Sequence, residues 1–290
     1  MLTNDQIVEF HRNGFLNGGR VLDDTGVQEL RDELQRVLDT GPEGFPEDGP
    51  RPVLFHNMVR DREPERCVWQ IVNIWEVSGA YQRLIHHPII VDAISRLTEA
   101  DELMVWHDQI QYKPAGYGGV TSWHQDAPLW PIIRPMTPVS AWVALDDATV
   151  ENGCMWMTPG SHRWGNQIEF LRTQAHLNQV EDFGRIEGFT PPACNGAEKA
   201  EKVAPRPWPV KAGEVSFHHS LTWHGSPFNR SDQPRRAIAM HYMTGESRFV
   251  ASGQHVMKAF VDLPDGAPMN QAGEHFPFVM RNGKPAALAG

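Results

Sequence analysis

His124, Asp126 and His224 are residues of the types that bind transition metals in proteins. His124 and Asp126 stand two positions apart, and side chains at positions i and i+2 of an extended strand point to the same face. His224 offers a second imidazole much later in the chain. Two imidazoles and one carboxylate on one face of an octahedron leave three positions open, an arrangement typical of non-haem iron(II) oxygenases. The His-x-Asp pair alone is weak evidence, because such pairs also form ordinary surface hydrogen bonds.

Two neighbouring histidines, His218 and His219, compete with His224 for the second imidazole position. If both lie on a strand, one of them points inward and the other points toward solvent. The residue types alone leave this choice open.

The N-terminal part of the chain, which must support any such site, is expected to be helical. Thr3 and Gln6 have the spacing of a capping box, and the helix that they begin should end at Gly14. A second stripe of apolar residues at helical spacing begins near Asp24 and stops at Thr40-Gly41-Pro42. A third helix is expected around residues 81–97.

Strands are expected from residue 103 onward, because turn signals there separate short apolar or alternating runs. The runs are Leu103–Lys113, Val139–Leu145, Gly153–Thr158, Glu214–His218 and Arg236–Met243. Several short strands behind a helical layer predict a mainly β fold with flanking helices and a double-sheet jelly-roll core.

We expect a single domain over residues 1–290. Its helical layer should occupy about 1–100 and its core about 101–250, followed by an irregular C-terminal tail. The polar segment at about 164–208 is expected to be an insertion that covers the site as a lid and carries specificity.

The composition limits the classes of partner. Lys and Arg total 26 against 36 for Asp and Glu, giving a net charge of −10, and no basic stripe is present. Nucleic acid and membrane are therefore not expected as partners. Three isolated cysteines form no disulfide framework, and the first residues lack the pattern of a secretory signal. We expect a cytoplasmic protein with a small-molecule substrate, and a homo-oligomer remains open.

Three blocks of sequence occur in order, WHQDAPLW, ENGCMWMTPGSHRWG and AGEVSFHHSLTWHGSPFNRSDQPRRAIAMHYM. Together they resemble the phytanoyl-CoA dioxygenase family of iron(II)- and 2-oxoglutarate-dependent enzymes. The resemblance implies a double-stranded β-helix (jelly-roll, cupin-like) core. It also implies Fe²⁺ as cofactor, 2-oxoglutarate and dioxygen as co-substrates, and His124, Asp126 and His224 as the catalytic metal ligands. His224 is favoured over its two rivals because it stands in the family's His-Gly-Ser sequence.

The resemblance further implies an arginine that binds the distal carboxylate of 2-oxoglutarate, which in this sequence is Arg235. A guanidinium suits this task because its planar fork meets a carboxylate with two hydrogen bonds. Arg236, its neighbour on a strand, should point to the opposite face. Supporting co-substrate contacts are expected from Ser226, Lys113, Gln109 and Trp142. Substrate contacts are expected from Trp130, Trp106 and Phe55, and Trp69 is a further aromatic candidate.

The reaction implied by the resemblance is hydroxylation of an unactivated C–H bond of a small-molecule metabolite, with release of succinate and carbon dioxide. The alternative is a non-oxidative metal-dependent enzyme, or a metal-binding module on the same jelly roll. Arg235 argues against both alternatives, because neither needs a carboxylate clamp beside the metal.

Overall fold

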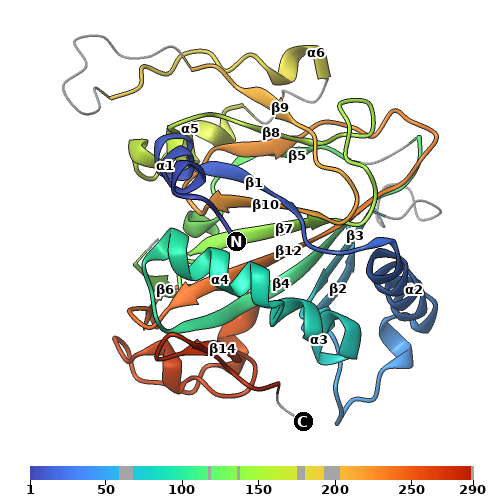
Figure 1. The fold of residues 1–290 in the computed structure, drawn as a ribbon, viewed down its shortest axis with the longest axis vertical. Coiled ribbons are helices and arrows are strands. Elements are labelled where there is room, and N and C mark those ends of the chain that lie inside the picture. Colours follow the sequence, from blue (N-terminus) through green and yellow to red (C-terminus); the bar gives the residue numbers. More distant parts are fainter. Residues whose placement is uncertain (59–67, 117–118, 136–137, 175–179, 193–202, 289–290) are drawn as a thin grey trace.

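Two antiparallel sheets form the centre of the protein (Figure 1). The computed structural model describes residues 1–58, 68–116, 119–135, 138–174, 180–192 and 203–288. Within these residues the larger sheet has nine strands, the smaller has four, and a separate ribbon has two. This mainly β architecture with flanking helices confirms the predicted fold class.

The larger sheet consists, in spatial order, of β1 (Phe15–Arg20), β10 (Glu214–His219), β7 (Val139–Ala144), β12 (Arg235–Thr244), β4 (Leu103–Lys113), β14 (Phe278–Arg281) and β15 (Lys284–Pro285). β3 (Trp69–Val72) also pairs with β4, and β2 (Leu54–Asn57) pairs with β3. The smaller sheet has the order β5 (Thr121–His124), β11 (His224–Ser226), β8 (Met155–Met157) and β9 (Arg206–Trp208). The ribbon pairs β6 (Ile133–Arg134) with β13 (Arg248–Phe249).

Strand β12 illustrates how the larger sheet separates two environments. Ile238 and Met240 belong to the main apolar core, which they share with apolar residues of the helices. The helices are α1 (Asn4–Asn13), α2 (Asp24–Thr40), α3 (Gly79–Ile85) and α4 (Pro88–Thr98). Arg235, Ala239 and His241 alternate with these core residues and line a cavity between the two sheets. One face of the sheet therefore builds the core, and the other builds the site.

The expected helical layer proves to be mixed. The first helix has the predicted capping box of Thr3 and Gln6, and it ends at Gly14, which adopts a left-handed conformation with φ of 84°. The following strand β1 pairs with β10, and β2 and β3 also join the larger sheet, so strands as well as helices occupy residues 1–100. The third helix is divided into α3 and α4, since Pro88 begins α4 and cannot continue a preceding helix.

The predicted insertion and tail contain more regular structure than expected. α5 (Ile168–Arg172) and α6 (Val180–Phe183) lie in the insertion, whereas β9 at its end pairs with β8 in the smaller sheet. The sequence also predicts a helix near residues 167–179, of which residues 175–179 lie outside the described residues. The tail contributes β14 to the edge of β4, so it is not wholly irregular. Among the described residues, no helix has the length and apolarity required to cross a bilayer.

Candidate metal centre

The two histidines of the candidate site are held by a direct strand pairing. His124 ends β5 and His224 begins β11, and the two are cross-strand partners. Residues directly opposite each other in an antiparallel pair have neighbouring side chains. The ring centroids of His124 and His224 lie 4.1 Å apart. The pairing therefore brings together two imidazoles that are distant in sequence.

Asp126 reaches the site by a different route from the one expected. The strand ends at His124, and Asp126 has helical angles (φ −70°, ψ −52°) at the start of a short 3-10 helix, Ala127–Leu129. The convergence of Asp126 with His124 thus comes from a turn after the strand and not from the two-residue repeat of a strand.

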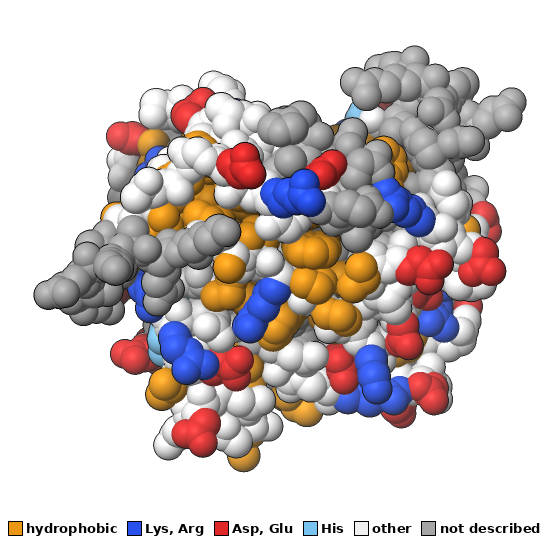
Figure 2. All heavy atoms as spheres, turned by 90° about the horizontal axis from the view of Figure 1, so that it is seen from above, with side chains coloured by type: hydrophobic (Ala, Val, Ile, Leu, Met, Phe, Trp, Pro, Cys, Tyr) orange, Lys and Arg blue, Asp and Glu red, His pale blue; other side chains and the backbone are white. Residues whose placement is uncertain are grey.

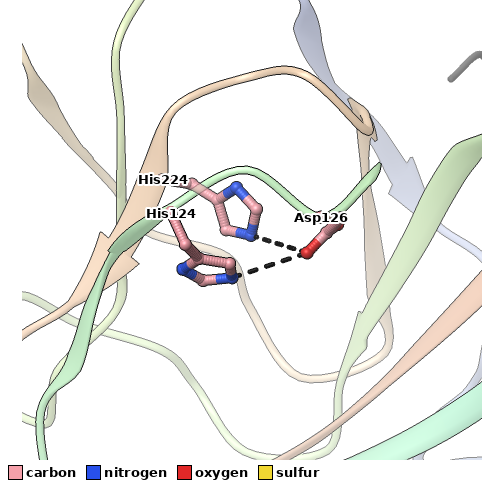
Figure 3. A group of neighbouring side chains, drawn as sticks. All are labelled: His124, Asp126 and His224. Atoms are coloured by element: carbon pink, nitrogen blue, oxygen red, sulfur yellow. Dashed lines mark ion pairs between the residues drawn. The ribbon is translucent and has the colours of Figure 1, made fainter. Parts of the chain in front are cut away.

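The three side chains converge on one point (Figure 3). Asp126 Oδ1 lies 3.4 Å from His124 Nε2 and 3.5 Å from His224 Nε2. The ligand atoms all lie within 4.8 Å of one another, and this is the one such group found among the described residues. The structure therefore brings together the three residues that the sequence singled out.

The backbone fixes the orientation of both imidazoles. His124 Nδ1 donates to the carbonyl oxygen of Ser122 at 2.8 Å, and His224 Nδ1 donates to that of Thr222 at 2.9 Å. A hydrogen bond from Nδ1 leaves the Nε2 lone pair free, which is the usual state of a metal-bound histidine. Two lone pairs and a carboxylate oxygen that face one another are electrostatically unfavourable unless a cation lies between them. The donor set thus fits a divalent metal ion such as Fe²⁺.

Two further side chains hold the other carboxylate oxygen of Asp126. Oδ2 accepts hydrogen bonds from His218 Nε2 at 3.1 Å and from Ser140 Oγ at 3.2 Å. Burial alone would raise the pKa of Asp126, but positive charge at the position of His224 and the hydrogen bond from His218 hold this pKa well below its usual range. A metal ion bound to the two Nε2 atoms would supply that charge while both ligand imidazoles stay neutral. Asp126 is therefore ionised, with Oδ1 left facing the two ligand histidines.

The same hydrogen bonds explain why the rival histidines are not ligands in this arrangement. An ionised carboxylate only accepts, so His218 Nε2 must carry a proton and has no lone pair to offer. His219 Nδ1 accepts a hydrogen bond from the backbone N–H of Leu221 at 3.0 Å. The ring centroids of His219 and His162 lie 5.4 Å apart. The structure thus brings His218 next to the site, as a partner of Asp126, and leaves His219 out of the triad.

We expect Ser140→Ala to weaken metal binding by about 10- to 100-fold, the usual cost of losing a partner that orients a ligand. The reason is that Oδ2 of Asp126 would keep one of its two donors. Titration of the metal-free protein with Fe²⁺ under argon measures the effect. Ser216→Ala is the matched control, since this buried serine on β10 bonds Trp208 and not Asp126. Equal affinities for the two variants would contradict the role of Ser140.

A second pair of side chains gives the cavity a buried positive end. Arg235 is 1% exposed and lies over the ring of Trp142, with 5.5 Å between the guanidinium carbon and the ring centroid. Its Nε and Nη1 have no hydrogen-bond partner within the described part of the chain. Buried donors are rarely left unpaired, so two such groups on one guanidinium indicate a site for an anionic ligand.

Lys113, the cross-strand partner of Arg235, adds to this positive end. Its Nζ donates to the carbonyl oxygens of Ser226 at 3.2 Å and of Pro227 at 2.6 Å. Burial lowers the pKa of Arg235 to about 10, and burial together with the charge of Arg235 lowers the pKa of Lys113 well below its usual range. A carboxylate bound here would favour the charged forms of both.

Arg236 has the opposite orientation. Its guanidinium forms a bidentate ion pair with Asp146, with both nitrogen–oxygen distances 2.8 Å, and Arg31 also contacts this carboxylate, at 3.0 Å. Arg235 and Arg236 thus lie on opposite faces of β12, as expected from strand alternation.

Comparison with known proteins identifies the family. A model of the family described as phytanoyl-CoA dioxygenase (PhyH) matches residues 10–237. The chain belongs to the phytanoyl-CoA dioxygenase family. Its members are iron(II)- and 2-oxoglutarate-dependent oxygenases, so the chain is an enzyme of this class, and the resemblance noted in the sequence is confirmed.

Curated relatives of this phytanoyl-CoA dioxygenase family member include two of different kinds. Phytanoyl-CoA dioxygenase domain-containing protein 1 of Danio rerio is 31% identical over 188 residues, which cover 63% of this chain. The match spans only 59% of that relative's own length. Methylphosphonate hydroxylase of Gimesia maris is 26% identical over 242 residues, covering 83% of this chain and 80% of the relative.

Solved structures share the fold over most of the chain. The non-haem alpha ketoglutarate dependent carbocyclase SnoK from nogalamycin biosynthesis is 25% identical, with a TM-score of 0.69 and coverage of 96% of this chain and 97% of that one. EctD from S. alaskensis, solved with bound Fe, is 20% identical with a TM-score of 0.66, covering 91% and 86%. The second likeness shows the fold alone.

The cavity of this family member has a volume of about 330 Å³ and runs from the metal ligands to the two buried cations. Five of the residues expected beside the co-substrate or substrate line it: Gln109, Lys113, Trp142, Ser226 and Trp130. Trp69 lines it as well. These residues are therefore placed where contact with small ligands is feasible.

The structure places Trp106 and Phe55 elsewhere. A shift in register between β12 and β4 leaves Trp106 without a partner in β12, and its ring stacks on Phe276 in an apolar cluster, with centroids 5.6 Å apart. Phe55 packs against Trp69, with ring centroids 5.1 Å apart, and borders a separate pocket of about 1470 Å³. Neither residue lines the metal cavity, and both expectations are corrected.

The sequence interpretation missed two polar residues of the site, Ser140 and His241. Both lie on the inner faces of their strands, and Ser140 Oγ lies 2.7 Å from His241 Nδ1. A signal for His241 was available, because steps of two residues from Arg235 along the predicted strand reach this position. No comparable signal pointed to Ser140.

The described part of the insertion lies behind the metal ligands. Trp123 and Trp223, the chain neighbours of the two ligand histidines, do not line the cavity and are buried against this segment in an apolar cluster. Phe183 stacks on Trp123 with ring centroids 5.0 Å apart, and Trp164 contacts Trp223 at 4.9 Å. None of the described residues of 164–208 lines the metal cavity. These residues therefore do not cover the cavity as the expected lid would, and instead pack against the strands that carry the ligands.

Figure 2 shows the molecule from the side of this layer, and apolar side chains gather at the centre of that face. The partly buried aromatic residues packed on the cluster are Trp156, Phe170 and Phe189. The insertion thus supports the strands that carry the ligands by apolar packing.

Proposed function

We propose that this chain catalyses the iron(II)- and 2-oxoglutarate-dependent hydroxylation of a C–H bond in a small molecule, with release of succinate and carbon dioxide. The observation that carries the proposal is Arg235, a buried guanidinium with two unpaired N–H groups in the same cavity as a His-Asp-His triad. A metal site that needs no dicarboxylate co-substrate has no use for such a group.

Each residue has a defined task in this proposal. His124, Asp126 and His224 hold the metal, and Ser140 and His218 keep Asp126 ionised and turned toward it. Arg235 binds the distal carboxylate of 2-oxoglutarate through two N–H groups, with Lys113 adding positive charge. Ser226, Gln109 and Trp142 line the co-substrate end, and Trp130 the substrate end. When bound, iron with 2-oxoglutarate and dioxygen supplies the oxidising chemistry, while the protein fixes the geometry and excludes water.

The cavity supports a small substrate. Its volume of about 330 Å³ must hold the co-substrate as well as the substrate. In the described residues Lys113 and Arg235 are the cationic side chains other than histidine that line it, and neither is free to bind a CoA diphosphate if both serve 2-oxoglutarate. The relative named methylphosphonate hydroxylase supports hydroxylation of a small compound as the reaction type.

Succinate formation from 2-oxoglutarate, measured with and without dioxygen, tests this proposal. We expect succinate in air with Fe²⁺, and none under argon or when Zn²⁺ replaces Fe²⁺. A non-oxidative enzyme or a metal-binding module would form no succinate under any of these conditions. The absence of oxygen-dependent succinate from protein that binds iron would therefore refute the proposal and favour that alternative.

A further inference from the structure

His241 lies on the wall of the metal cavity but is assigned no task above. It is 4% exposed, and it pairs across strands with Ser140 on β7 and with His107 on β4. Its ring centroid lies 4.7 Å from that of Trp130 and 4.7 Å from that of His107. His241 and Trp130 thus form one polar and one aromatic part of the same wall.

The position of the proton on His241 follows from the hydrogen bonds of Ser140. A serine hydroxyl has a single proton to donate, and an ionised carboxylate can only accept. Ser140 Oγ lies 3.2 Å from Asp126 Oδ2, so the serine hydroxyl donates its proton in a hydrogen bond to the carboxylate. Ser140 Oγ and His241 Nδ1 lie 2.7 Å apart, and in this hydrogen bond the histidine must then be the donor. His241 therefore carries its proton on Nδ1.

The other ring nitrogen, Nε2, is consequently a bare acceptor. Burial lowers the pKa of His241 to about 3, so the ring stays neutral and Nε2 gains no proton near neutral pH. Within the described residues no hydrogen bond to His241 Nε2 is found, and the ring lines the cavity. His107 differs, because its unpaired Nε2 is fully buried and its ring does not line the cavity.

We propose that His241 Nε2 accepts a hydrogen bond from the substrate, so that the substrate is a small molecule with a hydroxyl or N–H group. The apolar part of the substrate would then lie against Trp130. This inference rests on the proposed function and narrows its substrate class. A bare acceptor also discriminates, because an ether, ester or carboxylate oxygen at this point would face another lone pair and leave both unpaired.

The first test determines the tautomer of His241 in the absence of any substrate. In protein with ¹⁵N-labelled histidine, loaded with Zn²⁺ and 2-oxoglutarate, long-range ¹H–¹⁵N spectra distinguish a protonated from a bare ring nitrogen. The His241 signals are identified by their loss in His241→Phe. We expect a protonated Nδ1 and a bare Nε2, whereas a protonated Nε2 would overturn the proposal.

The second test uses probes in matched pairs, one member with a donor and the other with that hydrogen replaced by methyl. Cyclohexanol with methoxycyclohexane and 2-piperidone with N-methyl-2-piperidone are two such pairs. Binding to the same loaded protein is followed by tryptophan fluorescence. We expect the donor-bearing member to bind about 10- to 100-fold more tightly. The preference should vanish in His241→Phe and persist in part in His241→Gln, whose amide oxygen can accept.

The same substitutions at His219, a half-buried histidine that does not line the cavity, are the control and should leave the preference unchanged. Lack of preference in the native protein, lack of binding by all donor-bearing probes, or an equal preference in His241→Phe would each overturn the proposal. Neither test requires turnover. A failure of the proposed function would instead appear as absent succinate formation, with the probe preference intact.

Discussion

Replacement of His224 by alanine should abolish metal binding and turnover together. Two ligands would remain, and the nearest imidazole, that of His218, cannot take the vacant place. Its Nε2 carries a proton that is donated to Asp126. His124→Ala should have the same effect, because each histidine supplies one of three donor atoms within 4.8 Å of one another. The measurements are bound iron per chain after anaerobic loading, and succinate formed in air.

His219→Ala is the control for this prediction. It removes an imidazole only five positions from His224 in sequence, yet one that lies beside His162 and not in the triad. We expect this variant to keep its iron and measurable activity. A His219 variant without iron, or a His224 variant that retains it, would show that the ligand set is wrong.

Replacement of Arg235 by alanine should raise the apparent Michaelis constant for 2-oxoglutarate steeply. The distal carboxylate would lose its bidentate partner inside a buried cavity, and removing one partner of such a charge-assisted contact costs about 2–5 kcal/mol. That corresponds to an increase of tens- to thousands-fold, measured by succinate formation at varied 2-oxoglutarate. Arg235→Lys should give a smaller increase, because an ammonium group supplies charge without the planar fork.

Arg236→Ala separates this effect from a general loss of charge. Its guanidinium is bound to Asp146 on the other face of β12. We expect this variant to unfold at a lower temperature while its Michaelis constant for 2-oxoglutarate changes little. Equal increases for Arg235→Ala and Arg236→Ala would mean that the buried guanidinium is not the carboxylate partner.

Much of the site was open to prediction because it depends on short-range patterns. The two-residue repeat of a strand separated Arg235 from Arg236, whereas the choice of His224 came from the resemblance to the family's His-Gly-Ser sequence. The cap formed by Thr3 and Gln6 was equally local, since both residues belong to one helical turn. Such features need only the residues themselves and the geometry of a single element.

Other features were decided only when distant segments met. Strand β1 follows a helix and has an unremarkable sequence, but its pairing with β10 makes it the edge of the larger sheet. Trp106 is directed into an apolar cluster because of a shift in register between two strands that are far apart in the chain. Neither outcome can be read from one segment, because strand pairing depends on both partners.

The residue types of the metal centre, the proposed carboxylate partner Arg235 and the family could all be inferred from the sequence. Only the tertiary structure decided how Asp126 is turned into the site, what lies behind the ligand strands and where the protons of the site are placed. The physical reason is that these depend on cross-strand neighbours. His107, His241, Ser140 and His218 form a row across four strands, from β4 to β10. The positions of Ser140, His241 and His218 in the sequence carry no sign that hydrogen bonds link these three side chains to one another and to Asp126.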